Sequence, residues 1–297
     1  MTDDKIYAES FSRNIGVISE DEQRILQQLT VCVAGLGGIG GAVVSILARM
    51  GVGHFKIADI DTFDIKNINR QVSSSHSSLG KKKVHVLRDL IKDINPHAQV
   101  ECFEDGVQDY NVDSFLEGAD IVVDAIDFFC FSPRNILQSA CYRLKKPVLF
   151  SAPLGVSATF LMFAPGGVGF KEYFDFKDEL DNFGNLIRFT IGLTPSALHL
   201  KYMDFRPERL VEIQTGPSLC PSVHLGGAII AVELLKYVTK KAEPCIAPDY
   251  MQIDLLRNKM VKKRLYLGNK NPIQKLKYIL AYKKYSPYKE EFLKFIK

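Results

Sequence analysis

The sequence predicts an α/β fold, with a Rossmann-like, mostly parallel sheet that carries helices on both faces. Two observations predict it. Short apolar segments alternate along the chain with segments whose apolar residues recur at helical spacing. A glycine-rich turn at residues 35–40 joins the first apolar segment to a helical one. With 297 residues, 46% of them hydrophobic, the chain can bury one large core.

The predicted elements follow one another in a regular βαβ order. Ser19 is a candidate N-cap for the first helix, Gly51 ends the helix after the glycine turn, and Pro96 ends the next helix. We expect strands at residues 30–36, 55–61, 99–105, 119–127, 147–155 and 158–165, and helices at 20–29, 39–51, 80–96, 132–146 and 273–285.

Composition excludes several classes of protein. No apolar run approaches the ~18 residues that a membrane span needs, and the first residues are acidic and polar, unlike a secretory signal. The six cysteines lie far apart and form no Cys-x-x-Cys pair, so disulfides and zinc knuckles are not expected. We therefore expect a soluble, cytoplasmic protein with no membrane partner.

The C-terminal residues 257–297 form a basic tail. They hold thirteen Lys and Arg residues against Glu290 and Glu291, a net charge of +11, so the rest of the chain carries about −7 of the total of +4. This asymmetry fits an acidic partner, which can be a nucleic acid, a membrane surface or an acidic protein. It also fits a solvated amphipathic helix at 273–285 that packs on the domain by its apolar face.

The glycine-rich turn predicts a nucleotide site. Gly35, Gly37, Gly38 and Gly40 follow a strand and open a helix, where phosphate can approach the backbone and meet the positive end of the helix dipole. Asp59 ends the next strand, where a carboxylate can bind the ribose hydroxyls. The turn alone does not separate NAD from ATP.

Residues beyond the turn favour ATP. A guanidinium and an ammonium near the nucleotide suit a triphosphate better than a hydride donor, because they bind phosphate oxygens and neutralise their charge. Asp124 and Asp127 end a later strand, where a hard carboxylate can bind Mg²⁺. The polar residues after the second strand are Asn67, Arg70, Gln71 and Lys83.

Together these motifs resemble the ThiF/MoeB/ubiquitin-activating E1 superfamily of ATP-dependent adenylyltransferases. The resemblance covers about residues 8–240 and implies an adenylation domain at 1–240, followed by an extension at 241–297 that contains the basic tail. The matching stretches are SFSRNIG (10–16), GLGGIG (35–40), ADIDTFDIKNINRQ (58–71), GKKKV (80–84), INPH (94–97), VVDAID (122–127) and GPSLCPSVHLGGAIIAVELLKYV (216–238).

The resemblance implies a role for each matching position. Gly38 would face the α-phosphate, Asp127 would bind Mg²⁺, and Asp124 would support the strand end. Arg13 would reach across a homodimer into the ATP site of the partner. The implied catalytic set is Arg13, Arg70, Lys83 and Asp127. The implied ATP-binding set is Gly35, Gly37, Gly38, Gly40, Asp59, Asp61, Asn67, Arg70, Gln71 and Lys83.

The implied reaction joins a C-terminal carboxylate to AMP and releases pyrophosphate, so catalysis consists mostly of positioning and charge neutralisation. The expected substrate is a ubiquitin-like or sulfur-carrier protein, or a peptide. Three alternatives stay open. They are a tRNA-modifying enzyme of the threonylcarbamoyladenosine dehydratase type, a non-catalytic partner subunit and, in a different class, an NAD-dependent oxidoreductase.

The cysteines depart from the pattern of many relatives. The two Cys-x-x-Cys pairs that hold zinc in many relatives are absent, so no zinc is expected. Relatives that form a thioester keep a cysteine after the last predicted strand, but residues 164–214 contain none. Because Cys141 and Cys220 lie on helical patterns, we expect both to be core thiols. The predicted product is therefore the acyl-adenylate itself.

Three further features are predicted less sharply. The Phe-rich residues 169–187 fit a lid or docking surface, or a surface loop with a small cluster of its own. His199 and His224 show no partner by spacing, so we expect structural or surface roles for both.

Overall fold

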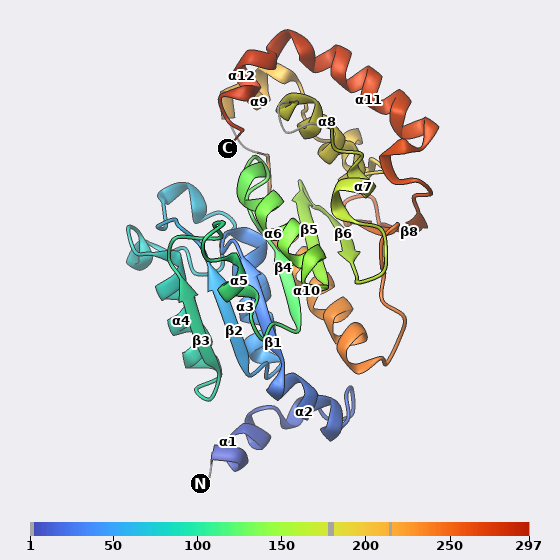
Figure 1. The fold of residues 1–297 in the computed structure, drawn as a ribbon. Helices are drawn as coiled ribbons and strands as arrows, with labels where there is room; N and C mark the ends of the chain where they lie inside the picture. The colour runs from blue at the N-terminus through green and yellow to red at the C-terminus, as the bar shows by residue number, and fades with distance from the viewer. Residues whose placement is uncertain (1–2, 178–180, 214–215, 297) are drawn as a thin grey trace.

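The computed structural model describes residues 3–177, 181–213 and 216–296. One eight-stranded sheet forms its centre, in the order β3-β2-β1-β4-β5-β6-β7-β8 (Figure 1). Strands β1 to β5 are parallel, and β6, β7 and β8 pair antiparallel, so the predicted α/β class is confirmed. The strands are β1 Thr30–Ala34, β2 His54–Ala58, β3 Gln99–Phe103, β4 Ile121–Asp124, β5 Val148–Leu154, β6 Ser157–Phe163, β7 Asp249–Asp254 and β8 Lys259–Arg264.

Helices cover both faces of the parallel strands. On one face α3 (Gly38–Arg49) packs against α4 (Lys83–Ile94) and α10 (Cys220–Thr239), while α5 (Val112–Leu116) contacts α6 (Phe131–Arg143) on the other. This arrangement follows from right-handed crossovers, which change face once the chain returns to the centre of the sheet. Helices α1 (Asp3–Ser10) and α2 (Glu20–Gln28) lie at the amino ends of the strands, and the predicted N-cap Ser19 begins α2.

Two of the hydrophobic clusters differ in their side chains. The aliphatic core lies between the sheet and α3, α4 and α10, and the aromatic core lies beside β5, β6 and β7. The aliphatic core includes Val31, Val33, Val43, Leu47, Ile57, Leu87, Val123 and Ile230. The aromatic core includes Phe131, Phe150, Phe163, Phe170, Tyr173, Phe174, Phe183, Phe189, Tyr250 and Phe292.

The Phe-rich residues 169–187 build a large part of the aromatic core, apart from 178–180, which lie outside the described residues. Helix α7 (Phe170–Phe174) buries three of its rings, and α8 (Asn182–Leu193) brings Phe183 and Phe189 against them. The surface-loop interpretation is wrong, because these rings join strand residues in one cluster rather than forming a small cluster of their own.

The chain beyond residue 240 adds two strands that the sequence pattern did not predict. Strand β7 pairs with β6, and β8 forms the edge of the same sheet. The predicted helix at 273–285 is present as α11 (Pro272–Tyr285); it packs against α8, and α12 (Lys289–Leu293) adds Phe292 to the aromatic core. Figure 1 shows α8, α9 (Pro207–Ile213), α11 and α12 grouped beyond the carboxyl ends of the parallel strands.

Helix α10 is an exception to the expectation that no apolar segment is long enough to span a membrane. By length and composition alone it could cross a membrane, because Glu233 and Lys236 are its only charged residues. In the structure 50% of this apolar stretch is buried, and the helix packs on α3, β5 and β6.

Candidate functional site

The glycine turn lies at the carboxyl end of β1, and two of its glycines are required by packing. Gly35 has φ +88°, and a Cβ there would overlap the backbone carbonyl of Ala125 after β4. A Cβ on Gly40 would overlap the carbonyl of Gly35. These two positions therefore exclude larger residues because the turn, α3 and the end of β4 approach one another closely.

The other two glycines differ, because Gly37 has room for a Cβ whereas Gly38 packs closely against α10. A Cβ on Gly37 would lie 3.5 Å from the amide nitrogen of Gln71, and one on Gly38 would lie 3.1 Å from a methyl group of Val223 in α10. Gln71 is only 8% exposed, yet its Oε1 atom has no hydrogen-bond partner. This unpaired buried acceptor beside the glycine turn can accept a hydrogen bond from a donor group of a ligand or from water.

An acidic and basic cluster borders the turn. The Asp59 carboxylate accepts hydrogen bonds from the N–H groups of Leu36 (2.6 Å) and Asp61 (2.8 Å). The buried Lys83 ammonium lies 2.8 Å from Asp61 and 4.0 Å from Asp59. The pKa of the Asp59 carboxyl is raised, because the effect of burial exceeds the opposite effect of Lys83 and the two N–H donors. The cluster fixes Asp59 against the glycine turn and holds Lys83 beside it.

The segment between β2 and α4 brings the other predicted phosphate contacts to this edge. A short 3-10 helix (Ile65–Asn67) is capped by Asp64, whose backbone N–H donates to Asn67. Arg70 donates to the Lys66 carbonyl (3.1 Å) and to the Asn69 side chain (2.8 Å). Among the described residues Arg70 forms no ion pair, so its guanidinium can bind an anion.

The two aspartates after β4 occupy different environments. Asp124 is fully buried and accepts hydrogen bonds from Arg134 (3.2 Å) and Gln138 (2.8 Å), so it supports the strand end. Asp127 is exposed, and its Oδ1 atom accepts the N–H of Phe129 at 3.0 Å. Arg134, which the sequence reasoning missed, contacts both Asp124 and the loop that carries Asp127.

The donor set at this edge fits a metal that is bound together with phosphate. Among the described residues no group of three or more His, Cys, Asp or Glu side chains is placed to hold a metal ion. Mg²⁺ in nucleotide sites takes one or two carboxylates and completes its shell with phosphate oxygens and water. The exposed Asp127 carboxylate fits that requirement.

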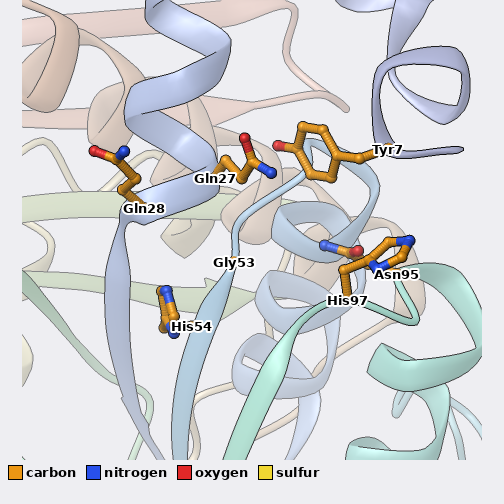
Figure 2. A pocket seen from close by; sticks show the side chains of 7 residues that line it. All are labelled: Tyr7, Gln27, Gln28, Gly53, His54, Asn95 and His97. Carbon is orange, nitrogen blue, oxygen red and sulfur yellow. The ribbon is translucent and has the colours of Figure 1, made fainter. Parts of the chain in front are cut away.

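Arg13 does not lie at this edge of its own chain. It is exposed in a short 3-10 helix (Ser12–Asn14), and the neighbouring Asn14 donates to the Met50 carbonyl at the far end of α3. A cavity of about 330 Å³ lies at the same amino end of the sheet, away from the glycine turn (Figure 2). Its lining residues are Tyr7, Gln27, Gln28, Gly53, His54, Asn95 and His97.

The predictions for cysteine and histidine were partly wrong. Cys141 is buried, as predicted, and burial raises the pKa of its thiol. Cys220 is exposed rather than buried, because it is the first residue of α10 and lies on the solvent side of a turn whose Ser222 and Val223 are buried. His224 does have a partner, since its Nδ1 atom lies 3.3 Å from the Cys220 sulfur one turn away. His199 is buried against Gln252 at 3.2 Å.

The family model named ThiF family matches residues 11–275. The chain belongs to the ThiF family. The heterocyst protein HesA of Trichormus variabilis is 28% identical over 268 residues, 89% of this chain and 88% of that relative. The Salmonella typhimurium molybdopterin-synthase adenylyltransferase is 33% identical over 48% of this chain and 56% of its own length. The Bacillus subtilis tRNA threonylcarbamoyladenosine dehydratase is 34% identical over 48% of this chain and 55% of its own.

Solved structures agree on the fold. The Escherichia coli MccB complex with AMPCPP and MccA superposes with a TM-score of 0.64 at 24% identity, covering 86% of this chain and 71% of MccB. This likeness shows that the mostly parallel sheet with its covering helices is the fold of ThiF-type enzymes. Adenylyltransferases are thus among the relatives of this ThiF-family chain.

Proposed function

We propose that this ThiF-family chain uses ATP to adenylate a C-terminal carboxylate, with acyl-AMP as the product and pyrophosphate as the leaving group. One observation supports this function most strongly. The carboxyl edge of β1, β2 and β4 holds the glycine turn, two cationic side chains (Arg70 and Lys83) and the exposed carboxylates of Asp61 and Asp127. Such a set suits a triphosphate with a divalent ion.

Each side chain has a task in this reaction. The backbone at Gly37 and Gly38 would approach the α-phosphate, and Arg70 would bind phosphate oxygens through its planar guanidinium. Lys83 would exchange its contact with Asp61 for one with phosphate. The substrate carboxylate attacks the α-phosphorus, a new carboxylate oxygen–phosphorus bond forms, and the bond to pyrophosphate breaks. Asp127 would hold Mg²⁺, which supplies charge neutralisation at the phosphates when bound.

The proposal includes a partner subunit and a macromolecular substrate. Because Arg13 lies far from the glycine turn of its own chain, its implied role in ATP binding requires a homodimer. Peptides are a reasonable substrate class, since the superposed MccB structure contains the peptide MccA. We place the protein in the cytoplasm, where the absence of disulfides among its described residues is the norm.

A tRNA-modifying function is the second candidate, and the basic tail favours it.

Calorimetric titration with ATP–Mg²⁺ and with NAD tests which nucleotide the protein binds. Tight NAD binding without ATP binding would contradict the proposal. Mass spectrometry after incubation with ATP, Mg²⁺ and carrier proteins, peptides or tRNA then identifies the acceptor. Absence of both acyl-AMP formation and pyrophosphate exchange, with ATP still bound, would favour the non-catalytic subunit.

A further inference from the structure

Arg134 is the largest fully buried side chain among the described residues. It lies in the first turns of α6, directly after the loop that joins β4 to that helix. Burying a guanidinium costs several kcal/mol unless every donor is satisfied and a counter-charge is close. The partners of Arg134 therefore indicate what its buried charge does.

Its donors are directed to one short loop. Nε lies 3.2 Å from the Asp124 carboxylate, which balances the charge. The terminal nitrogens donate to three backbone carbonyls of the loop, those of Ile126, Phe128 (3.5 Å) and Cys130 (3.4 Å). These alternate along residues 126–130, so one planar group spans the loop on both sides of Asp127.

Two aromatic rings hold the guanidinium in place. Its central carbon lies 4.8 Å from the ring centre of Phe189 in α8 and 5.6 Å from that of Phe150 in β5. Phe189 also packs on Phe128 of the loop, with ring centres 5.3 Å apart. Cation–π contacts in a dry environment restrict the position of the charge and exclude water from it.

We propose that Arg134 is a positioning residue for Asp127, and this inference rests on the proposed function. By holding the carbonyls at 126, 128 and 130, it fixes the loop in the one conformation that presents the Asp127 carboxylate at the nucleotide edge. Arg134 reaches no substrate itself. The aromatic core, through Phe189, is then part of the support of the metal-binding carboxylate.

A purely structural role would not require this arrangement. An apolar side chain of similar volume often stabilises a core as well as a buried ion pair does. Gln138 provides the matched comparison, since it shares the Asp124 carboxylate at 2.8 Å from the same helix but forms no side-chain hydrogen bond to the loop among the described residues. Loss of Arg134 and loss of Gln138 should therefore differ in their effect on the loop.

The test compares Arg134→Met, Arg134→Lys and Gln138→Met in the full-length protein. We expect the Mg²⁺ concentration for half-maximal pyrophosphate exchange to rise about ten-fold or more in Arg134→Met, the usual size for loss of a supporting partner of a metal ligand. Arg134→Lys, which cannot span three carbonyls, should fall between wild type and Arg134→Met. Gln138→Met should keep the wild-type Mg²⁺ requirement.

Hydrogen exchange gives a readout that is independent of activity. The amides of Phe129 and Cys130, which bond to Asp127, should exchange faster in both Arg134 variants and normally in Gln138→Met. If folded Arg134→Lys keeps the wild-type rates of amide hydrogen exchange and the wild-type Mg²⁺ requirement, the inference is overturned. It is also overturned if Gln138→Met changes both quantities as much as the Arg134 variants do. An inactive wild type with a loop that Arg134 still protects would refute the proposed function and leave the loop contacts established.

Discussion

The two cores stabilise different parts of the molecule with different side chains. The aliphatic core packs Val, Ile and Leu from parallel strands against α3, α4 and α10, and it supports the glycine turn from beneath. The aromatic core brings together rings from α7, α8, β5, β6 and the C-terminal helices, and it contacts the loop that carries Asp127. Aliphatic packing depends mainly on volume, whereas ring packing also has preferred orientations and binds cations.

Under the proposed function, this difference separates support of the nucleotide from support of the proposed metal ligand Asp127. The turn is positioned by backbone proximity, since Gly35 and Gly40 allow no side chain there. The Asp127 loop is positioned by side chains, through Arg134 and Phe189. The following predictions test this division, in order of decreasing effect.

The largest effect is expected for Asp127→Ala. We expect pyrophosphate exchange to fall at least about a hundred-fold, because charge neutralisation by a bound metal contributes several kcal/mol at the transition state. The fold should survive with only a small fall in melting temperature, since this carboxylate is exposed and its loss removes the exposed hydrogen bond from the Phe129 N–H. Asp124→Asn should instead destabilise the fold, because it weakens the counter-charge of buried Arg134. Near-normal exchange in Asp127→Ala would mean that another group holds the metal.

Phe189→Ala compared with Leu47→Ala tests whether the cores differ in function. Each should lower the free energy of unfolding by about 2–5 kcal/mol in urea titrations, because both side chains are fully buried. Only Phe189→Ala should raise the Mg²⁺ requirement for exchange, since Phe189 packs on Arg134 and Phe128. If Leu47→Ala raises it equally, the effect follows from stability and the division between the cores fails.

Arg13 tests whether the nucleotide site is completed by a second subunit. Arg13→Ala and Asp127→Ala homodimers should each be inactive. An equal mixture should regain about a quarter of wild-type activity, because half of the dimers are hybrids and each hybrid has one intact site. Mass spectrometry must confirm that subunits exchange. Absence of rescue after confirmed exchange would refute a shared site.

His199 predicts a pH effect on stability. Burial lowers the pKa of His199 to about 4, although Asp254 raises it. Below about pH 6.5 the unfolded chain binds a proton that the folded one excludes, so the free energy of unfolding should fall by up to about 1.4 kcal/mol per pH unit down to pH 4. His199→Gln should remove this contribution, whereas exposed His224→Gln should not. Urea titrations at pH 7 and pH 5 measure both slopes, and parallel slopes would contradict the assignment.

The smallest effect is expected for Cys220→Ser. Pyrophosphate exchange should stay at the wild-type level, because the exchange occurs at phosphorus before any thiol could act. We still expect free acyl-adenylate as the product, from the absence of cysteine in residues 164–214, although Cys220 is exposed beside His224. A substrate adduct on non-reducing gels that disappears in Cys220→Ser would show that this cysteine accepts the acyl group.

The sequence allowed most of the nucleotide half to be predicted. Its strands and helices are each defined by local periodicity, and the glycine turn, Asp59 and Asp127 follow strand ends that the parallel topology must bring together. Lys83 begins α4 and reaches the same edge through its contacts with Asp61 and Asp59. The aromatic half was harder to predict. Strand β7 forms because it pairs with β6, almost a hundred residues earlier, and β8 then pairs with β7, although the basic β8 shows no apolar alternation.

Two site residues illustrate the same limit. Arg134 is one of two arginines in a helical pattern, and nothing local indicates that it is buried between two rings from distant segments. Cys220 was assigned to the core from the apolar pattern of α10, but it lies on the exposed face of the first turn, whereas Ser222 and Val223 of the same turn are buried. Long-range packing decides both cases.

The close approach of Gly35 to Ala125 makes the glycine turn and the strand end before Asp127 a single rigid element. Their relative position is set during folding, so the protein loses little conformational freedom when a nucleotide binds there. The four glycines of one short motif are then under two separate kinds of selection. Gly35, Gly38 and Gly40 are restricted by packing and would be retained by any protein that must keep this fold, even without activity, whereas Gly37 has room for a Cβ and would be retained for the proposed phosphate binding alone.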